Sequence, residues 1–290
     1  MRISRSAIGL LMLVAACAQT SPARTETPAP RSETPAPRTD ASALSPAELP
    51  ARPLDVDGEA VRLRAALRRE VPHLIVDPPA AERGWIERSR AAVADGNERI
   101  ERPQLLVVVD RNPRVQQMRI VVARPHADWQ DLGGTRISTG QTGRFDYYLT
   151  PTGVFLHTDA ILDWRAEGTF NENHVRGLGL KGMRVWDFGW QTAAKGWTEE
   201  DGQIRLLMHA TDPANLERRL GRPASKGCVR IPAAMNRFID RHGVLDADYE
   251  RAAQSDPGFA ALLSADHAPT PLAGNMLVVI DSSEPPRPGA

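Results

Sequence analysis

The chain has 290 residues, with 36 basic and 36 acidic side chains, so its formal net charge is zero. This balance provides no overall basic excess of the kind that proteins use to bind nucleic acid. Only two cysteines occur, Cys17 and Cys228, which excludes a framework of disulfide bonds. The length is sufficient for one good domain or two small ones.

Residues 1–17 have the pattern of a lipoprotein-type signal segment. A short basic start precedes an apolar run from Ala7 to Ala16, which at about ten residues is too short to span a bilayer. The run ends in Val-Ala-Ala-Cys17, which resembles a bacterial lipobox with Cys17 as the lipidated residue. Simple cleavage at the A-x-A site around Cys17 is the alternative. Both alternatives predict export to the periplasm or cell envelope, and lipidation adds a membrane anchor.

Residues 18–53 are rich in proline and threonine, and the segment Thr25 to Arg31 is nearly repeated by Ser32 to Arg38. Such a composition cannot bury a core, so we expect a disordered linker of polyproline-like character. One hypothesis is that it lets an anchored domain reach the cell wall. A spacer without geometric purpose is the alternative.

Residues 54–100 are expected to form a helical N-terminal extension. Gly58 to Glu70 and Glu82 to Asp95 have helical spacing, and prolines separate them. We expect Trp85 to pack inward. A separate binding module is the alternative, although about forty residues is very small for one.

Residues 101–282 are expected to form the main domain, of the α+β class and rich in β structure. Gln104 to Asp110 and Gln117 to Ala123 predict a hairpin, and Met276 to Ile280 predicts a last strand. A strand is also predicted at Arg136 to Gly140. A turn at Thr150-Pro-Thr-Gly153 should lead into a further strand. Residues 283–290 are expected to be a flexible tail.

The segment from Leu156 to Gly202 has no clear periodicity and is expected to be irregular. It contains Trp164, Trp186, Trp190 and Trp197, which we expect to pack in the core. The alternative is that some of them line a substrate cleft, or that the segment forms a flap over a site.

Three helices are predicted in the last third of the chain. Asp212-Pro213 is typical of a helix start, so a helix is expected from Pro213 to Leu220. A second is expected from Ala233 to His242, where it should brace the loop that precedes it, and a third from Asp246 to Leu263.

The candidate chemistry lies between His209 and Cys228. His209 ends an apolar, strand-like run, and Cys228 follows nineteen positions later. A thiol has a pKa of about 8.5 and becomes a nucleophile when an imidazole removes its proton. Gly227 permits unusual backbone angles, and the N–H groups of Gly227 and Cys228 are candidates for stabilising an oxyanion. This combination suggests acyl transfer by a cysteine, with His157 as the second choice of base.

The same segment resembles the active-site motif of the L,D-transpeptidases, the YkuD-type family. Fifteen residues separate His209 from Ser225, and Gly227-Cys228-Val229-Arg230 falls in register with the family pattern. The Ser-Thr-Gly and Thr-Pro-Thr-Gly segments upstream also resemble the family. Lys226 departs from the histidine that the family most often has there, and its charge could favour the thiolate.

The resemblance implies a β-sandwich or barrel-like sheet core with flanking helices, and it implies a reaction on peptidoglycan stem peptides. Cys228 would attack the carbonyl of the third stem residue, and His209, oriented by a backbone carbonyl, would give the proton to the departing D-alanine. An amine of another stem would then resolve the thioester. Ser225 would shape the loop. Arg230 would either orient the loop or bind a substrate carboxylate, and a salt bridge to the domain is the structural alternative.

Two rival functions stay open. The enzyme could hydrolyse stem or wall-protein links as an L,D-carboxypeptidase or amidase. Alternatively, the chain could be a non-catalytic wall-binding lipoprotein. No histidine or cysteine pair has the spacing of zinc ligands, so neither a metal nor a cofactor is expected. The sequence does not indicate the oligomeric state or the acceptor.

Overall fold

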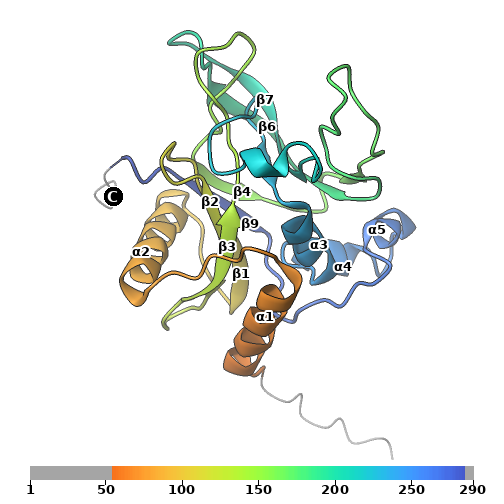
Figure 1. Ribbon diagram of the computed structural model, residues 1–290. Helices are drawn as coiled ribbons and strands as arrows, with labels where there is room; N and C mark the ends of the chain where they lie inside the picture. Colours follow the sequence, from red (N-terminus) through yellow and green to blue (C-terminus); the bar gives the residue numbers. More distant parts are fainter. Residues whose placement is uncertain (1–53, 285–290) are drawn as a thin grey trace, which may run out of the picture. The chain divides into compact units, whose positions relative to one another are not determined.

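The computed structural model describes residues 54–284, which belong to one compact unit. The signal segment at 1–17 with Cys17, the linker at 18–53 and most of the tail lie outside the described residues. The described part is a mixed α+β structure with two sheets, which confirms the expected fold class (Figure 1).

The first sheet has the strand order β3-β2-β1-β9-β4. Its strands are β1 (Gln104–Asp110), β2 (Gln117–Ala123), β3 (Gln130–Arg136), β4 (Gly153–Leu156) and β9 (Met276–Ile280). The predicted bounds of β1, β2 and β9 are confirmed, and β1 pairs antiparallel with β2 and parallel with β9. Every residue of β1 is buried, as expected of a central strand covered on both faces.

Two N-terminal helices, α1 (Val56–Glu70) and α2 (Pro79–Asp95), cover this sheet, as Figure 1 shows. The cluster that contains Leu63 of α1 includes Leu105 and Val107, whereas the cluster that contains Trp85 of α2 includes Leu106 and Val108. Because alternate residues of a strand face opposite sides, the two helices pack against opposite faces of β1. Both predicted helices and the inward packing of Trp85 are therefore confirmed.

The second sheet has the order β5-β6-β7-β8. Its strands are β5 (Trp164–Arg165), β6 (Arg184–Ala194), β7 (Asp201–Ala210) and β8 (Val229–Ile231). The prediction that Leu156 to Gly202 is irregular is thus wrong for β5 and β6. A β-bulge between Asp187 and Trp190, with Gly189 at a φ of +75°, interrupts the alternation by which a sequence reveals a strand.

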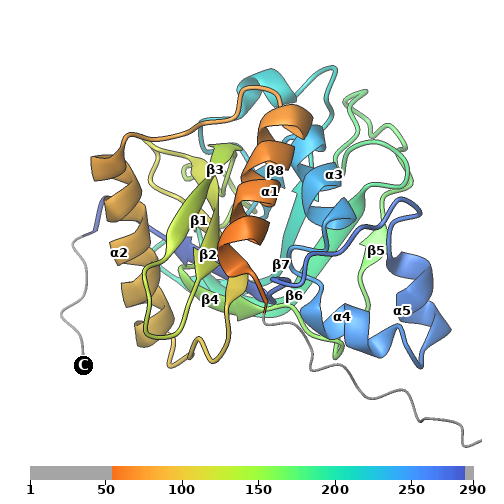
Figure 2. The same ribbon diagram turned by 90° about the horizontal axis from the view of Figure 1, so that it is seen from below.

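The C-terminal part contains α3 (Ala233–Arg241), which was predicted, and two short helices, α4 (Ala247–Ala252) and α5 (Pro257–Leu262). The single helix expected from Asp246 to Leu263 is wrong, because Pro257 starts a new helix that the Asp256 side chain caps. Figure 2 shows α3 beside α1 and close to the second sheet.

The helix expected from Pro213 to Leu220 is also wrong, since only a 3-10 turn, η1 (Glu217–Arg219), forms. The Asp212 carboxylate accepts the N–H groups of Ala214 and Asn215 at 2.9 and 3.3 Å. Side-chain bonds of this kind favour turns over a helix.

One hydrophobic core joins the two sheets. Met208 of β7 and Val229 of β8 share a cluster with β1, α1 and α3, in which Met235, Phe238 and Ile239 are buried. Helix α3 therefore packs behind the strand that follows Cys228. None of the helices within residues 54–284 is long and apolar enough to cross a membrane.

Candidate active site

The pairing of β7 with β8 brings the two candidate catalytic residues together. The strands are parallel, and His209 is the register partner of Arg230. Cys228 lies two residues before Arg230 and one residue ahead of β8, so continuing the alternation of the strand puts it on the face that Arg230 shares with His209. One strand spacing and two residues along the strand place the Cα atoms of His209 and Cys228 about 8 Å apart. An imidazole and a thiol that share a face can meet across this separation.

His209 is held in one tautomer. Its Nδ1 lies 2.7 Å from the backbone carbonyl oxygen of Ala210, so Nδ1 carries the proton and donates it to that oxygen. Nε2 is then a free acceptor. Burial, together with the positive charge of Arg230, lowers the pKa of His209 to about 4. The imidazole is therefore neutral near pH 7, the state that a base requires.

Cys228 is a free, partly exposed cysteine at the end of its loop. Burial raises the pKa of the Cys228 thiol, the Asp187 carboxylate raises it further, and the Leu207 N–H and Arg230 oppose this rise. At rest both the thiol and the imidazole are therefore neutral. Such a pair acts by proton transfer during attack and not through a preformed thiolate.

The expected influence of Lys226 on the thiol is replaced by that of Arg230. The Lys226 ammonium lies on the surface, 2.6 Å from the Asp146 carboxylate, and its charge is not among the causes that shift the pKa of Cys228. Arg230 is the cation that acts on the sulfur. No local pattern indicates that Lys226 pairs with Asp146, because the two residues are far apart in the chain.

Ser225 shapes the cysteine loop, in line with the role expected for it. Its hydroxyl accepts the N–H of Gly227 at 3.1 Å and donates to the carbonyl of Cys228 at 2.6 Å. Gly227 has a φ of +131°, and a Cβ there would lie 2.8 Å from Ile204 Cδ1. Glycine is therefore required at this position by both its backbone angle and its close neighbour.

One of the two expected oxyanion donors is already engaged. Because the Gly227 N–H donates to Ser225, it is not free for a substrate oxygen, and this part of the prediction is wrong. The Cys228 N–H has no acceptor among residues 54–284 and remains the candidate.

The two upstream motifs hold the loop from the other side. Thr150 Oγ1 donates to the Gly227 carbonyl at 2.7 Å and accepts the N–H of Gly140 at 2.9 Å. Ser138 and Arg230 exchange both backbone hydrogen bonds, at 2.9 and 2.8 Å. The continuous strand expected from Arg136 to Gly140 is wrong beyond Arg136, since isolated bridges take its place. The supporting role of the Thr150 hydroxyl was missed, although its motif was visible in the sequence.

Arg230 forms no salt bridge with any carboxylate of the described residues, so the structural alternative for it is wrong. One terminal nitrogen donates to the Ala224 carbonyl at 3.2 Å, while Nε is buried without a partner. The side chain therefore retains donors that a substrate carboxylate can use.

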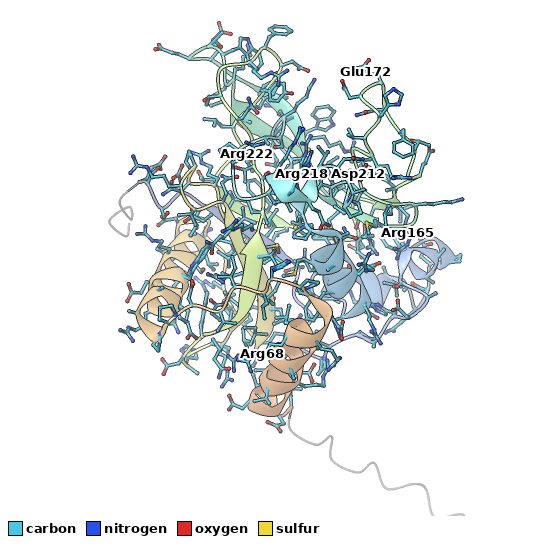
Figure 3. All side chains as sticks on the ribbon, in the orientation of Figure 1. Arg68, Arg165, Glu172, Asp212, Arg218 and Arg222 are labelled. Carbon is cyan, nitrogen blue, oxygen red and sulfur yellow. The ribbon has the colours of Figure 1, made fainter. Side chains whose placement is uncertain are left out.

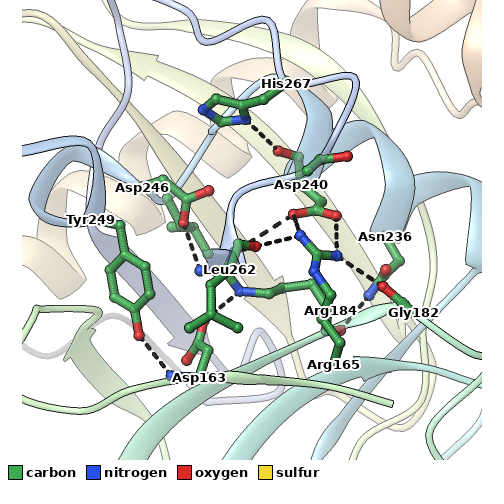
Figure 4. A network of polar contacts seen from close by, with 12 residues as sticks. Asp163, Arg165, Gly182, Arg184, Asn236, Asp240, Asp246, Tyr249, Leu262 and His267 are labelled. Atoms are coloured by element: carbon green, nitrogen blue, oxygen red, sulfur yellow. Dashed lines mark hydrogen bonds and ion pairs between the residues drawn. The ribbon is translucent and has the colours of Figure 1, made fainter. Parts of the chain in front are cut away.

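His157, the second choice of base, lies in a different environment. Its two ring nitrogens lie 2.9 Å from the Leu245 carbonyl and 2.9 Å from the Asp163 carboxylate. The Asp163 carboxylate also accepts from Arg184 Nε at 2.8 Å and from the Asp187 N–H at 2.9 Å. Figure 4 shows the part of this network around Arg184, which lies between Asp163 and Asp246. His157 has no free ring nitrogen to serve the sulfur.

The four tryptophans are divided between core and surface. Trp186 is fully buried, as expected, and Trp164 is partly buried. Trp190 is 65% exposed, which makes the core prediction wrong for this residue. Trp197 stacks edge-on against Tyr148 at 5.1 Å, beside the cysteine loop.

Comparison with known proteins does not indicate a family for this chain. No family model matches the chain, and no curated protein matches it.

Proposed function

We propose that this chain is a cysteine-dependent peptidoglycan L,D-transpeptidase of the YkuD type, exported to the periplasm and anchored by a lipid on Cys17. The observation that carries the proposal is the pairing of β7 with β8. It sets His209, with Nδ1 held by a carbonyl, on the same face as the free thiol of Cys228. The sequence motif supplies the substrate class.

The first half of the reaction forms an acyl-enzyme. His209 Nε2 takes the thiol proton while Cys228 Sγ bonds to the carbonyl carbon of the third stem residue. The Cys228 N–H stabilises the oxyanion. As the tetrahedral intermediate collapses, the carbon–nitrogen bond to the terminal D-alanine breaks, and His209 gives its proton to that amine.

The second half regenerates the thiol. An amine of another stem attacks the thioester carbonyl and loses a proton to His209. The carbon–sulfur bond then breaks, and the departing Cys228 sulfur recovers the proton. Because both groups are neutral at rest, no charge has to be buried before the substrate arrives.

Incubation of the purified protein with disaccharide tetrapeptides, followed by mass spectrometry of the products, tests this function. We expect crosslinked dimers from the wild type and none from Cys228→Ala. Hydrolysed tripeptides without dimers would assign the chain to the carboxypeptidases instead. Equal products from both proteins would favour the non-catalytic, wall-binding alternative.

A further inference from the structure

A cavity of about 680 Å³ lies outside the proposed catalytic pair. Its wall comes from the connector between α1 and α2, the end of β3, η1 and the start of α3. Figure 1 shows the connector crossing the first sheet below η1. The cavity thus joins the N-terminal helical segment to the loop that runs from His209 to Cys228.

The wall of this cavity is cationic. It contains the side chains of Arg136 and Arg218, and neither forms an ion pair with a carboxylate anywhere in residues 54–284. The acid in the wall, Glu217, accepts the N–H of Ala233 at 2.5 Å, which turns its carboxylate toward the start of α3. With two guanidinium groups against one carboxylate, the wall keeps a net positive charge that favours an anion.

Two more arginines strengthen this charge. Arg219 and Arg222 flank Arg218 in the same segment and also lack an ion-pair partner within the described part of the chain. Figure 3 labels Arg218 and Arg222 around η1. Arg219 and Arg222 do not line the cavity, but they add positive charge to the exposed segment beside it, which favours an anion there.

The remainder of the wall suits an organic ligand. Ile75, Leu220 and Pro232 contribute apolar surface. A ligand with an aliphatic body and carboxylate groups matches both parts of the wall. Inorganic phosphate would use the arginines alone.

The cavity lies about one short peptide's length from Cys228. Arg136 and Pro232, which belong to its wall, are each two residues from the Ser138–Arg230 bridge, on the side away from Cys228. Pro232 is thus four residues along the backbone from Cys228, a span of about 13 Å. An extended peptide of about four residues covers the same length.

We propose that this cavity binds the carboxylates of the acceptor stem peptide, whose amine then reaches the thioester on Cys228. The inference rests on the proposed function and adds the residues that select the acceptor. Arg136 and Arg218 are its anchoring residues. They take no part in acylation by the donor.

Two measurements on the double variant Arg136→Gln/Arg218→Gln test the proposal. In transfer assays, the KM for a stem tetrapeptide acceptor should rise about tenfold or more, as expected for losing charged hydrogen bonds. The rate of acyl-enzyme formation and the KM for glycinamide, an acceptor without a carboxylate, should stay unchanged. Arg68→Gln, which removes an exposed arginine from α1, is the matched control and should change neither.

The second measurement does not depend on catalysis. Calorimetric titration of the Cys228→Ala protein with the tetrapeptide should show binding that weakens about tenfold in the arginine double variant. Amidation of the peptide carboxylates should weaken it equally. Unchanged binding, slower acylation in place of weaker acceptor use, or tighter binding of inorganic phosphate than of the peptide would each overturn the inference. Failure of the wild type to acylate at Cys228 would instead remove the proposed function.

Discussion

Two buried histidines, His209 and His157, show how one side chain can serve opposite purposes. His209 has a single hydrogen bond, to a neutral carbonyl, and burial lowers its pKa to about 4. His157 has acceptors at both ring nitrogens, one of them the Asp163 carboxylate, and its pKa is raised despite burial. The first is a neutral base with a free nitrogen, and the second is a fixed cation in a structural network.

The difference also sets opposite dependences of stability on pH. The folded pKa of His209 lies below its unfolded value of about 6.5, so its contribution is complete above that pH and is lost as the pH falls toward 4. The folded pKa of His157 lies above the unfolded value, so its contribution is complete below pH 6.5. That contribution is lost as the pH rises through the folded pKa.

The largest effect on stability is expected from Asp163→Asn. The Asp163 carboxylate accepts hydrogen bonds from His157, Arg184 and the Asp187 N–H, so its removal leaves two buried cations without their shared partner. Breaking a buried ion pair from one side costs about 3–5 kcal/mol of unfolding free energy. Denaturant unfolding should show this loss. Glu200→Gln, which breaks the exposed pair with Lys195, is the control and should change little.

The next effect concerns His209 and pH. Between pH 6.5 and 4 the wild type should lose about 3 kcal/mol of unfolding free energy through His209 alone, since each pKa unit corresponds to about 1.36 kcal/mol. His209→Asn removes the titrating ring, so its unfolding free energy should fall less over the same range. Parallel curves for the two proteins would show that His209 is not a buried neutral imidazole.

A smaller effect is expected from Thr150→Val, which preserves shape but removes the hydroxyl. The Gly227 carbonyl and the Gly140 N–H each lose a buried hydrogen bond, at a cost of about 1–3 kcal/mol. Acylation should slow as well, because the cysteine loop loses a support. A Thr150→Ser variant, which retains the hydroxyl, should restore most of both properties.

The smallest effect is expected from Lys226→Met. The Lys226–Asp146 pair is more than half exposed on both sides, and such pairs contribute less than about 1 kcal/mol. The reactivity of the Cys228 thiol toward iodoacetamide as a function of pH should also be unchanged. A clear shift of that profile would return Lys226 to the role first expected from its position in the motif.

The sequence predicts the central strands well because their signals are local. Strands β1, β2 and β9 are rich in β-branched and aliphatic residues, and their bounds are confirmed. Strand β6 is not predicted, because its bulge and its mixed polarity interrupt the alternation of apolar and polar residues that is typical of a strand. The break between α4 and α5 shows that Pro257, followed by Gly258, outweighs helical periodicity around it.

The candidate site likewise has a part that local sequence predicts and a part that it does not. His209 and Cys228 can be found by spacing within one segment. The contacts that orient these two residues cannot be predicted from spacing. They join distant parts of the chain, as the hydrogen bond from Thr150 to Gly227 does. Even the loss of the Gly227 N–H as a free donor depends on the rotamer of Ser225, which no sequence pattern specifies.

The most direct test of the account is acylation of the thiol itself. Wild-type protein incubated with a tetrapeptide donor should gain the mass of the donor less one D-alanine, on the peptide that contains Cys228. His209→Asn should acquire the same adduct about a hundredfold or more slowly, as expected when a general base is lost. An adduct on another residue, or acylation of His209→Asn at the wild-type rate, would contradict the account.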